Sequence, residues 1–299
     1  MLKQRTDLAL EKHELNCENR FDDGIIVEEE SISNIKISRI IIEDKDASDK
    51  ANLRKGKYIT VEVGAIWNED NVYLNNCIEI VKNELLGMID KTLKKCLIVG
   101  LGNRRILCDS IGPMVVDNIL VTRHIKALNN EMFDELSFLE VSAIATGVLG
   151  DTGIETLEIT RAVASKIEPD FIIVIDALAS RNIERLAKTI QITNSGISPG
   201  SGVNNNRNEL SMETIGVPVL SVGVPTVVDA STLVLNALEG VGINKIDLIE
   251  KYFSEKRNFF VSLKDTDIII KKMTKLLSSS INYALQNRME IEDIENLTN

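Results

Sequence analysis

Two short runs of consecutive apolar residues limit the possible folds of this chain more than any other feature. Cys96-Leu97-Ile98-Val99-Gly100 and Phe171-Ile172-Ile173-Val174-Ile175 are apolar throughout. Strands buried on both faces have this pattern, and they occur mainly in parallel sheets that helices cover on each side. Residues 189–193 and 217–222 predict two further strands.

Amphipathic helical patterns lie between and after these strands. The predicted helices span residues 71–94, 113–128, a stretch from the Thr152-Gly153-Ile154-Glu155 capping box to the residue before Pro169, residues 226–238, and a last amphipathic stretch at 263–287. The alternation predicts an α/β protein, a three-layer α/β/α arrangement around a mostly parallel sheet, as in phosphorylase/hydrolase-like folds.

The first fifty residues differ from the rest of the chain. They are polar and rich in charge, with a short alternating run at residues 35–40. We expect a mobile N-terminal segment followed by an edge strand. A second alternating run at residues 58–63 predicts another strand.

Charge and composition argue against several classes of function. The chain of 299 residues has a formal net charge of −11 that no run of Lys and Arg offsets, so we expect no direct nucleic-acid binding. Residues 1–14 contain no apolar h-region, and no apolar run approaches the roughly 18 residues of a membrane span, so no membrane partner is expected. The four cysteines show no CxxC motif, which fits a reducing cytoplasm. Only His13 and His124 offer imidazoles, which restricts zinc sites and Ser-His-Asp triads.

Two aspartates stand where ligands bind in open α/β sheets, just beyond the carboxyl ends of strands. Asp176 directly follows the strand at residues 171–175, and Asp109 lies in the loop after residues 96–100. If these strands are neighbours, the carboxylates converge on one cleft, where one keeps a proton as acid and the other activates water. From position alone, an N-cap for Asp109 and a loop-bracing hydrogen bond for Asp176 remain open alternatives.

Three short motifs suggest other chemistry, and we interpret each as structural. Asp151-Thr152-Gly153 spells the DTG of pepsin-like proteases, but those enzymes need two such loops, and Thr152 is expected to cap a helix. Gly196-Ile197-Ser198-Pro199-Gly200 matches GxSxG, but no helical pattern follows Ser198. Gly100-Leu101-Gly102 begins a GxGxxG that lacks its third glycine. His124 is expected on a helix surface or in the core.

Long runs of this sequence resemble the germination protease family of spore-forming bacteria. The matching residues are 5–9, 100–103, 109–118, 120–124, 150, 152–156, 169–179, 195–197, 199–203, 216–218 and 223–230. The likeness spans nearly the whole chain, and runs of this length are far more specific than any short motif. The sequence departs from the family in the loop at residues 104–108 and at Ser198, where bacillus members carry His.

The resemblance implies an endopeptidase that degrades small acid-soluble spore proteins during germination. It places the two catalytic aspartates at Asp109 and Asp176. An aspartic-type dyad is favoured, no cofactor is expected, and whether a divalent metal takes part stays open. A likeness of the Gly-x-Gly-Asn…Asp pattern to the hydrogenase-maturation endopeptidases, which coordinate nickel in their substrate, leaves that activity as an alternative. A nucleotide-binding α/β domain that uses the Gly100–Gly102 loop is the non-peptidase alternative.

The resemblance also implies a homotetrameric zymogen of the cytoplasm of the forespore and the spore core. Family members remove a short N-terminal segment from themselves, and the family's processing site matches Arg5-Thr6-Asp7-Leu8-Ala9. We therefore expect residues 1–7 to be a propeptide that is released by cleavage between Asp7 and Leu8. Residues 8–299 are expected to form a single α/β peptidase domain with a C-terminal amphipathic helix. From the residues alone, Thr6 and Asp7 could instead cap a short helix that begins at Leu8.

Overall fold

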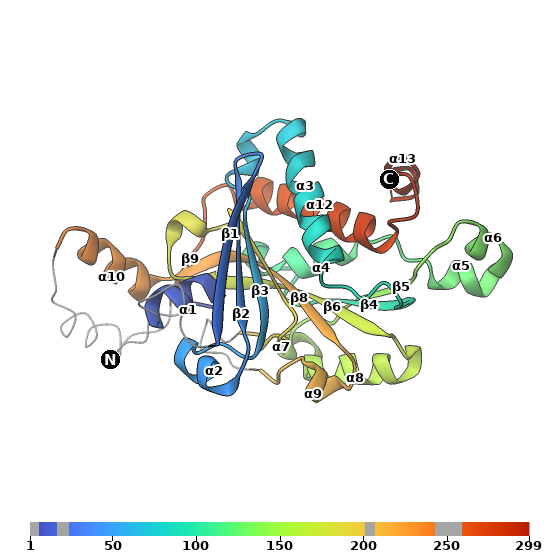
Figure 1. The fold of residues 1–299 in the computed structure, drawn as a ribbon, viewed down its shortest axis with the longest axis horizontal. Coiled ribbons are helices and arrows are strands. Elements are labelled where there is room, and N and C mark those ends of the chain that lie inside the picture. Colours follow the sequence, from blue (N-terminus) through green and yellow to red (C-terminus); the bar gives the residue numbers. More distant parts are fainter. Residues whose placement is uncertain (1–5, 17–23, 201–206, 243–258, 299) are drawn as a thin grey trace.

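Strands and helices alternate along the chain, and the strands form one large sheet with helices against both faces (Figure 1). The computed structural model describes residues 6–16, 24–200, 207–242 and 259–298. Within this part of the chain the sheet has nine strands, namely β1 (Ile25–Ile32), β2 (Ile35–Ile42), β3 (Gly56–Glu62), β4 (Lys95–Gly100), β5 (Glu140–Ala145), β6 (Phe171–Ser180), β7 (Thr189–Thr193), β8 (Val219–Asp229) and β9 (Phe260–Val261).

The sheet is mixed, so the expectation of a mostly parallel sheet is wrong. Its strand order is β1-β2-β3-β7-β8-β6-β4-β5, with β9 paired to β8. β8, β6, β4 and β5 are parallel neighbours, whereas β1, β2, β3, β7 and β8 follow one another antiparallel. Antiparallel strands need only short connections, and β1 and β2 are joined by Ser33 and Asn34, whose φ angles of 51° and 65° suit a tight hairpin turn.

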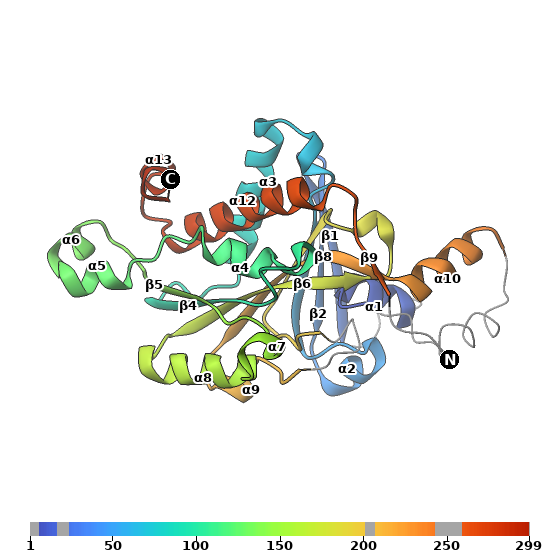
Figure 2. The same cartoon turned by 180° about the vertical axis from the view of Figure 1, so that it is seen from behind.

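Helices cover both faces of this sheet. Figure 2 shows α3, α4 and α12 on one side of the sheet and α8 and α9 on the other. The described helices are α1 (Ala9–Asn16), α2 (Lys45–Ala51), α3 (Asn71–Leu86), α4 (Ile111–Val116), α5 (Arg123–Leu128), α6 (Asn130–Glu135), α7 (Leu149–Thr152), α8 (Thr156–Ile167), α9 (Met212–Ile215), α10 (Ala230–Gly240), α12 (Thr266–Leu285) and α13 (Ile291–Thr298). Short 3₁₀ turns are η1 (Ile66–Asn68), η2 (Leu107–Asp109) and η3 (Ile183–Arg185). Among the described ranges, no helix combines the length and the apolar character that crossing a bilayer requires.

Side chains of each strand alternate between two hydrophobic cores. Ile173 and Ile175 of β6 belong to the core that α3, α4 and α12 cover. Ile172 and Val174 point to the opposite face, where they pack in the core beside α8 and α9. By the same alternation, Asp176 projects from the face of Val174.

The N-terminal segment is docked on the sheet, and the expectation that it is mobile is wrong for residues 6–16. Leu8 and Ala9 are fully buried. The carboxylate of buried Glu11 accepts hydrogen bonds from the Ser180 hydroxyl at 2.9 Å and from the N–H groups of the next two residues at 2.6 and 3.0 Å. The predicted edge strand, β2, is also not at the edge, because β1 pairs outside it.

The predicted helix at residues 113–128 is interrupted, and α4 and α5 take its place. The main chain between α4 and α5 is hydrogen-bonded to the buried side chain of Asn282 on α12 instead of continuing the helix. Asn282 accepts a hydrogen bond from the N–H of Leu120 and donates one to the carbonyl of Asn118, both at 3.0 Å. Such a long-range pair leaves no trace in local periodicity.

Thr152 ends a short helix instead of beginning a longer one, so its predicted capping role is wrong. It is the last residue of α7, and Gly153 follows with a φ of 70°. α8 begins only at Thr156, after Glu155, whose side chain makes no capping hydrogen bond. The local pattern resembled a capping box, but the preceding turn had already formed a helix.

Candidate active site

A loop that packs backbone against backbone fixes Asp109 at the end of β4. Gly102 has a φ of 108°, and a Cβ added there would lie 2.1 Å from the carbonyl oxygen of Asp109. A Cβ on Gly112, in the helix that follows, would lie 2.3 Å from the carbonyl oxygen of Leu101. Any side chain at either position would force the loop open.

The carboxylate of Asp109 is held by a backbone donor of its own loop. The N–H of Asn103 donates to Asp109 Oδ2 at 2.8 Å, and the N–H of Asp109 donates to the carbonyl of Ile106 at 2.8 Å. Ser110, not Asp109, occupies the N-cap of α4. The alternative that Asp109 is a helix cap is therefore excluded.

A β-bulge in β8 fastens the same loop from the other side. β8 continues through Pro225, where the sequence pattern suggested that the strand had ended, and its register with β6 shifts between Leu178 and Ala179. The shift leaves Thr226 outside the strand pairing, and its hydroxyl donates to the carbonyl of Cys108 at 2.6 Å. Bulges often redirect a side chain in this way beside active sites.

Asp176 lies inside β6 and not at its end, because the strand continues to Ser180. Pairing with β4 nevertheless stops at Ile175, opposite Gly100, so Asp176 is the first residue beyond the carboxyl end of β4. Its side chain is buried, and Oδ1 accepts a hydrogen bond from the N–H of Ala177 at 2.9 Å. β4 and β6 are neighbours, and Asp109 and Asp176 line one cavity.

The two carboxyl groups differ in their affinity for a proton. Burial raises the pKa of Asp109 to about 6, although the hydrogen bond from the Asn103 N–H favours the ionised form and lowers the pKa. The pKa of Asp176 is raised well above its usual value, first by burial and then by the negative charges of Asp109 and Asp7. Near neutral pH this pair can hold a proton on Asp176 beside an ionised Asp109, which is the arrangement that acid–base hydrolysis requires.

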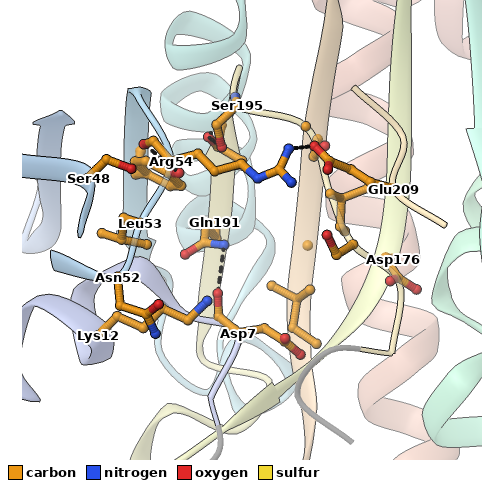
Figure 3. A pocket seen from close by; sticks show the side chains of 18 of the residues that line it. Asp7, Lys12, Ser48, Asn52, Leu53, Arg54, Asp176, Gln191, Ser195 and Glu209 are labelled. Carbon is orange, nitrogen blue, oxygen red and sulfur yellow. Dashed lines mark hydrogen bonds and ion pairs between the residues drawn. The ribbon is translucent and has the colours of Figure 1, made fainter. Parts of the chain in front are cut away.

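Two adjoining cavities meet at Asp176. Their volumes are about 370 and 360 Å³, and both are lined by Asp7, Asp176, Leu178 and Gly200. The second cavity, which contains Asp109, has apolar walls that include Ile106, Val148, Leu149, Val227 and Phe260. Figure 3 shows the first cavity, where Asp7 meets Gln191 and its carboxylate extends toward Asp176.

A carboxyl group that gains proton affinity on folding makes stability depend on pH. The proton on Asp109 stabilises the fold fully below the unfolded pKa near 4, and this contribution is lost as the pH rises through about 6. We therefore expect Asp109→Asn to be more stable than the wild type at pH 8, by on the order of 2 kcal/mol, with the difference shrinking toward pH 4. Urea unfolding at several pH values measures this.

The matched control is Asp117→Asn. Asp117 is exposed and pairs with exposed Arg104, so removing its charge should change stability by less than about 1 kcal/mol. An Asp109→Asn protein that is less stable than the wild type at pH 8 would contradict the raised pKa.

The residues interpreted as structural lie apart from the carboxyl pair or lack the geometry for catalysis. Asp151 is exposed on α7 and pairs with Arg105 at 3.6 Å. Ser198 lines the first cavity, but a turn at Pro199 and Gly200 follows it instead of a helix. His124 is exposed on α5. Across the residues that the structure describes, no three His, Cys, Asp or Glu side chains are grouped as a metal site.

The glycines of the Gly100-Leu101-Gly102 turn serve close packing instead of nucleotide binding. A Cβ on Gly100 would lie 2.4 Å from the carbonyl oxygen of Gly112. The N–H of Asn103, which would face a phosphate in a nucleotide loop, donates to Asp109. The geometry therefore disfavours the nucleotide-binding alternative.

Comparison with known proteins decides the family. The sequence profile described as Germination protease matches residues 4–247. The chain belongs to the germination protease family. A germination protease of Clostridium perfringens (strain 13) is 37% identical over 326 residues, covering 100% of both chains. That of Bacillus cereus (strain ATCC 10987) is 42% identical over 298 residues, covering 97% of this chain and 76% of the relative.

Among solved structures, a NiFe hydrogenase maturation protease from Thermococcus kodakarensis aligns with 68% of this chain and 99% of its own, at 14% identity and a TM-score of 0.36. A likeness this distant has no bearing on function. Membership of the germination protease family rests on the sequence matches.

The sequence did not predict that two other residues, Asp7 and Gln191, line a cavity together with Asp176. Asp7 was predicted as a processing residue, but nothing in its neighbourhood indicated that it lies beside Asp176. Gln191 sits in the alternating run Thr-Ile-Gln-Ile-Thr, where a polar residue ordinarily faces solvent, yet it is only 7% exposed. The N-terminal segment that covers it is 182 residues away in the sequence.

Proposed function

We propose that this chain is an endopeptidase that begins the degradation of small acid-soluble spore proteins during germination, with Asp109 and Asp176 as its catalytic carboxyl groups. The observation that supports it best is the pairing of these two groups in one cavity, both with raised pKa values, in a chain of the germination protease family. Structural carboxylates seldom combine burial with a like-charged neighbour.

In the proposed reaction Asp109 is the base and Asp176 is the acid. A water molecule gives a proton to ionised Asp109, and its oxygen bonds to the carbonyl carbon of the scissile peptide. The carbon–nitrogen bond then breaks as Asp176 gives its proton to the leaving nitrogen. One water is consumed, and the proton that Asp109 gained replaces the one that Asp176 lost.

The same site is proposed to process its own N-terminus between Asp7 and Leu8, which releases residues 1–7, of which residues 1–5 lie outside the described part of the chain. Asp7 is bound beside Asp176 on the part of β6 that extends beyond β4: its N–H donates to the carbonyl of Ala179, and the N–H of Ala179 donates to Asp7 Oδ2, both at 2.9 Å. The chain then turns into α1, and the N–H of Leu8 donates to the Thr6 hydroxyl at 3.0 Å. The segment is thus both a short helix start, as the alternative reading expected, and an occupant of the cavity.

The acidic side chain of Asp7 suggests which peptides the site accepts. The N–H of Ala179 donates a hydrogen bond to this carboxylate. The apolar walls of the second cavity suit a hydrophobic residue next to the acidic one. Cleavage after an acidic residue and before a hydrophobic one, as in Asp7-Leu8-Ala9, agrees with these surroundings. We further propose that residues 8–299 act as one peptidase domain in a homotetramer of the forespore and spore-core cytoplasm.

Incubation of the purified full-length chain with a small acid-soluble spore protein tests this function. We expect a few discrete fragments with cuts after acidic residues, formed equally with and without a chelator if the carboxyl pair acts without a metal. Mass spectrometry of the fragments locates the cuts. No cleavage would contradict the function, and cleavage that a chelator abolishes and nickel restores would favour the hydrogenase-maturation type of chemistry.

A further inference from the structure

One row of paired residues connects Asp176 and Gln191 across three strands of the sheet. Asp176 of β6 pairs with Gly223 of β8, and Gly223 pairs with Gln191 of β7. Directly paired residues project from the same face of a sheet, so Gln191 and Asp176 face the same cavity, which both line. They are two strands apart, which is about 10 Å between main chains, and the residue between them has no side chain.

Gln191 contacts the N-terminal segment on both sides of the bond between Asp7 and Leu8. Its Nε2 donates to the carbonyl oxygen of Asp7 at 3.3 Å (Figure 3). Its Oε1 accepts the N–H of Ala9 at 2.5 Å. The orientation of the amide is fixed, because a carbonyl can only accept and an N–H can only donate. The contacted carbonyl is the one that the proposed reaction attacks.

We infer that Gln191 is a catalytic residue that binds the carbonyl oxygen of the scissile peptide. When water adds to that carbonyl, its oxygen gains negative charge, and the Nε2–H donor stabilises this charge more than it stabilises the neutral carbonyl. The Oε1 acceptor meanwhile holds the main chain two residues beyond the attacked carbonyl. Both contacts are with main-chain atoms, which every peptide has. Gln191 can therefore bind a spore protein in the same way when it replaces the N-terminal segment.

The surroundings of Gln191 fit this role. It is buried at the cavity wall, so its hydrogen bonds are not exchanged freely with water. Gly223 makes room for the side chain of Leu178, which also lines the cavity, because a Cβ at Gly223 would lie 2.4 Å from it.

The inference rests on the proposed function, and its test uses the full-length chain. We expect Gln191→Met, which keeps the length of the side chain, to lower kcat for a small acid-soluble spore protein by on the order of 10²–10³, as loss of one such donor does elsewhere. Self-cleavage should slow by a similar factor. Gln191→Glu keeps the acceptor for the Ala9 N–H but removes the donor, so it should also lose kcat.

The control is Thr60→Val. Thr60 of β3 pairs with Gln191 in the same row, one strand farther from Asp176, and is also buried. This variant should cleave like the wild type, and urea unfolding should show that all three variants are folded. A purely structural Gln191 would change the unfolding midpoint and leave kcat unchanged.

The outcomes separate this inference from the function on which it rests. Folded Gln191→Met and Gln191→Glu proteins that cleave the spore protein with a kcat within twofold of the wild type would overturn the inference alone. A wild-type chain that cleaves neither the spore protein nor itself would overturn the proposed function and the inference with it.

Discussion

Asp109→Asn and Asp176→Asn are each expected to lose cleavage of a small acid-soluble spore protein by on the order of 10²–10⁴ in rate, the usual effect of removing a general acid or base. Asparagine keeps the size of the side chain and can still accept the hydrogen bonds from Asn103 and Ala177. Circular dichroism and urea unfolding should therefore show an intact fold. Gel-based cleavage rates of the two variants and the wild type measure the loss.

The control for this pair is Asp151→Asn. Asp151 belongs to the DTG motif but is exposed and pairs only weakly with Arg105, so its variant should keep near-normal activity. Near-normal turnover in either Asp109→Asn or Asp176→Asn would remove that residue from the proposed dyad. Inactivation of a folded Asp151→Asn protein would revive the pepsin-like interpretation.

The second large effect concerns maturation. N-terminal sequencing of the active form is expected to begin at Leu8, and Asp7→Lys should stop its appearance. Lysine cannot accept the hydrogen bond from the Ala179 N–H, and it brings a positive charge to a position that an acidic side chain now occupies. Asp7→Glu keeps the charge and the acceptor and should be processed.

Asp176→Asn protein, incubated alone, should stay full length. Mixing it with wild-type enzyme then distinguishes cleavage within one chain from cleavage between chains. An active form that begins well away from Leu8, or an Asp176→Asn protein that matures unaided, would show the maturation proposal to be wrong.

The sequence predicted that Asp109 and Asp176 converge on one cavity better than it predicted the strands that hold them. Asp176 was singled out because the apolar run stops there, although the strand does not. β6 continues beyond the end of β4, and its main chain there binds the N-terminal segment. The continuation depends on pairing with β8, whose Gly223 and Pro225 look like the end of a strand. Local pattern cannot reveal pairing partners that are dozens of residues away.

The sequence analysis predicted too few antiparallel strands for a different reason, because it missed β1. β1 carries three consecutive glutamates and is mostly exposed, so it lacks the alternation that marks a half-buried strand. Charged residues on an edge strand discourage unwanted pairing with other molecules. Its register with β2 is set by the turn at Ser33 and Asn34.

The docking of Asp7 on Ala179 has a consequence for inhibition. The N–H and the carbonyl of Ala179 are both engaged by Asp7, so no external peptide can pair with this residue while the segment is in place. A short tether gives a bound segment an effective concentration in the millimolar range. A spore protein would have to exceed that concentration to compete before the proposed maturation, whereas afterwards the same seven residues would be an ordinary diffusible product. Cutting one bond would thus turn an intramolecular competitor into a dilute one, without any rearrangement of the sheet.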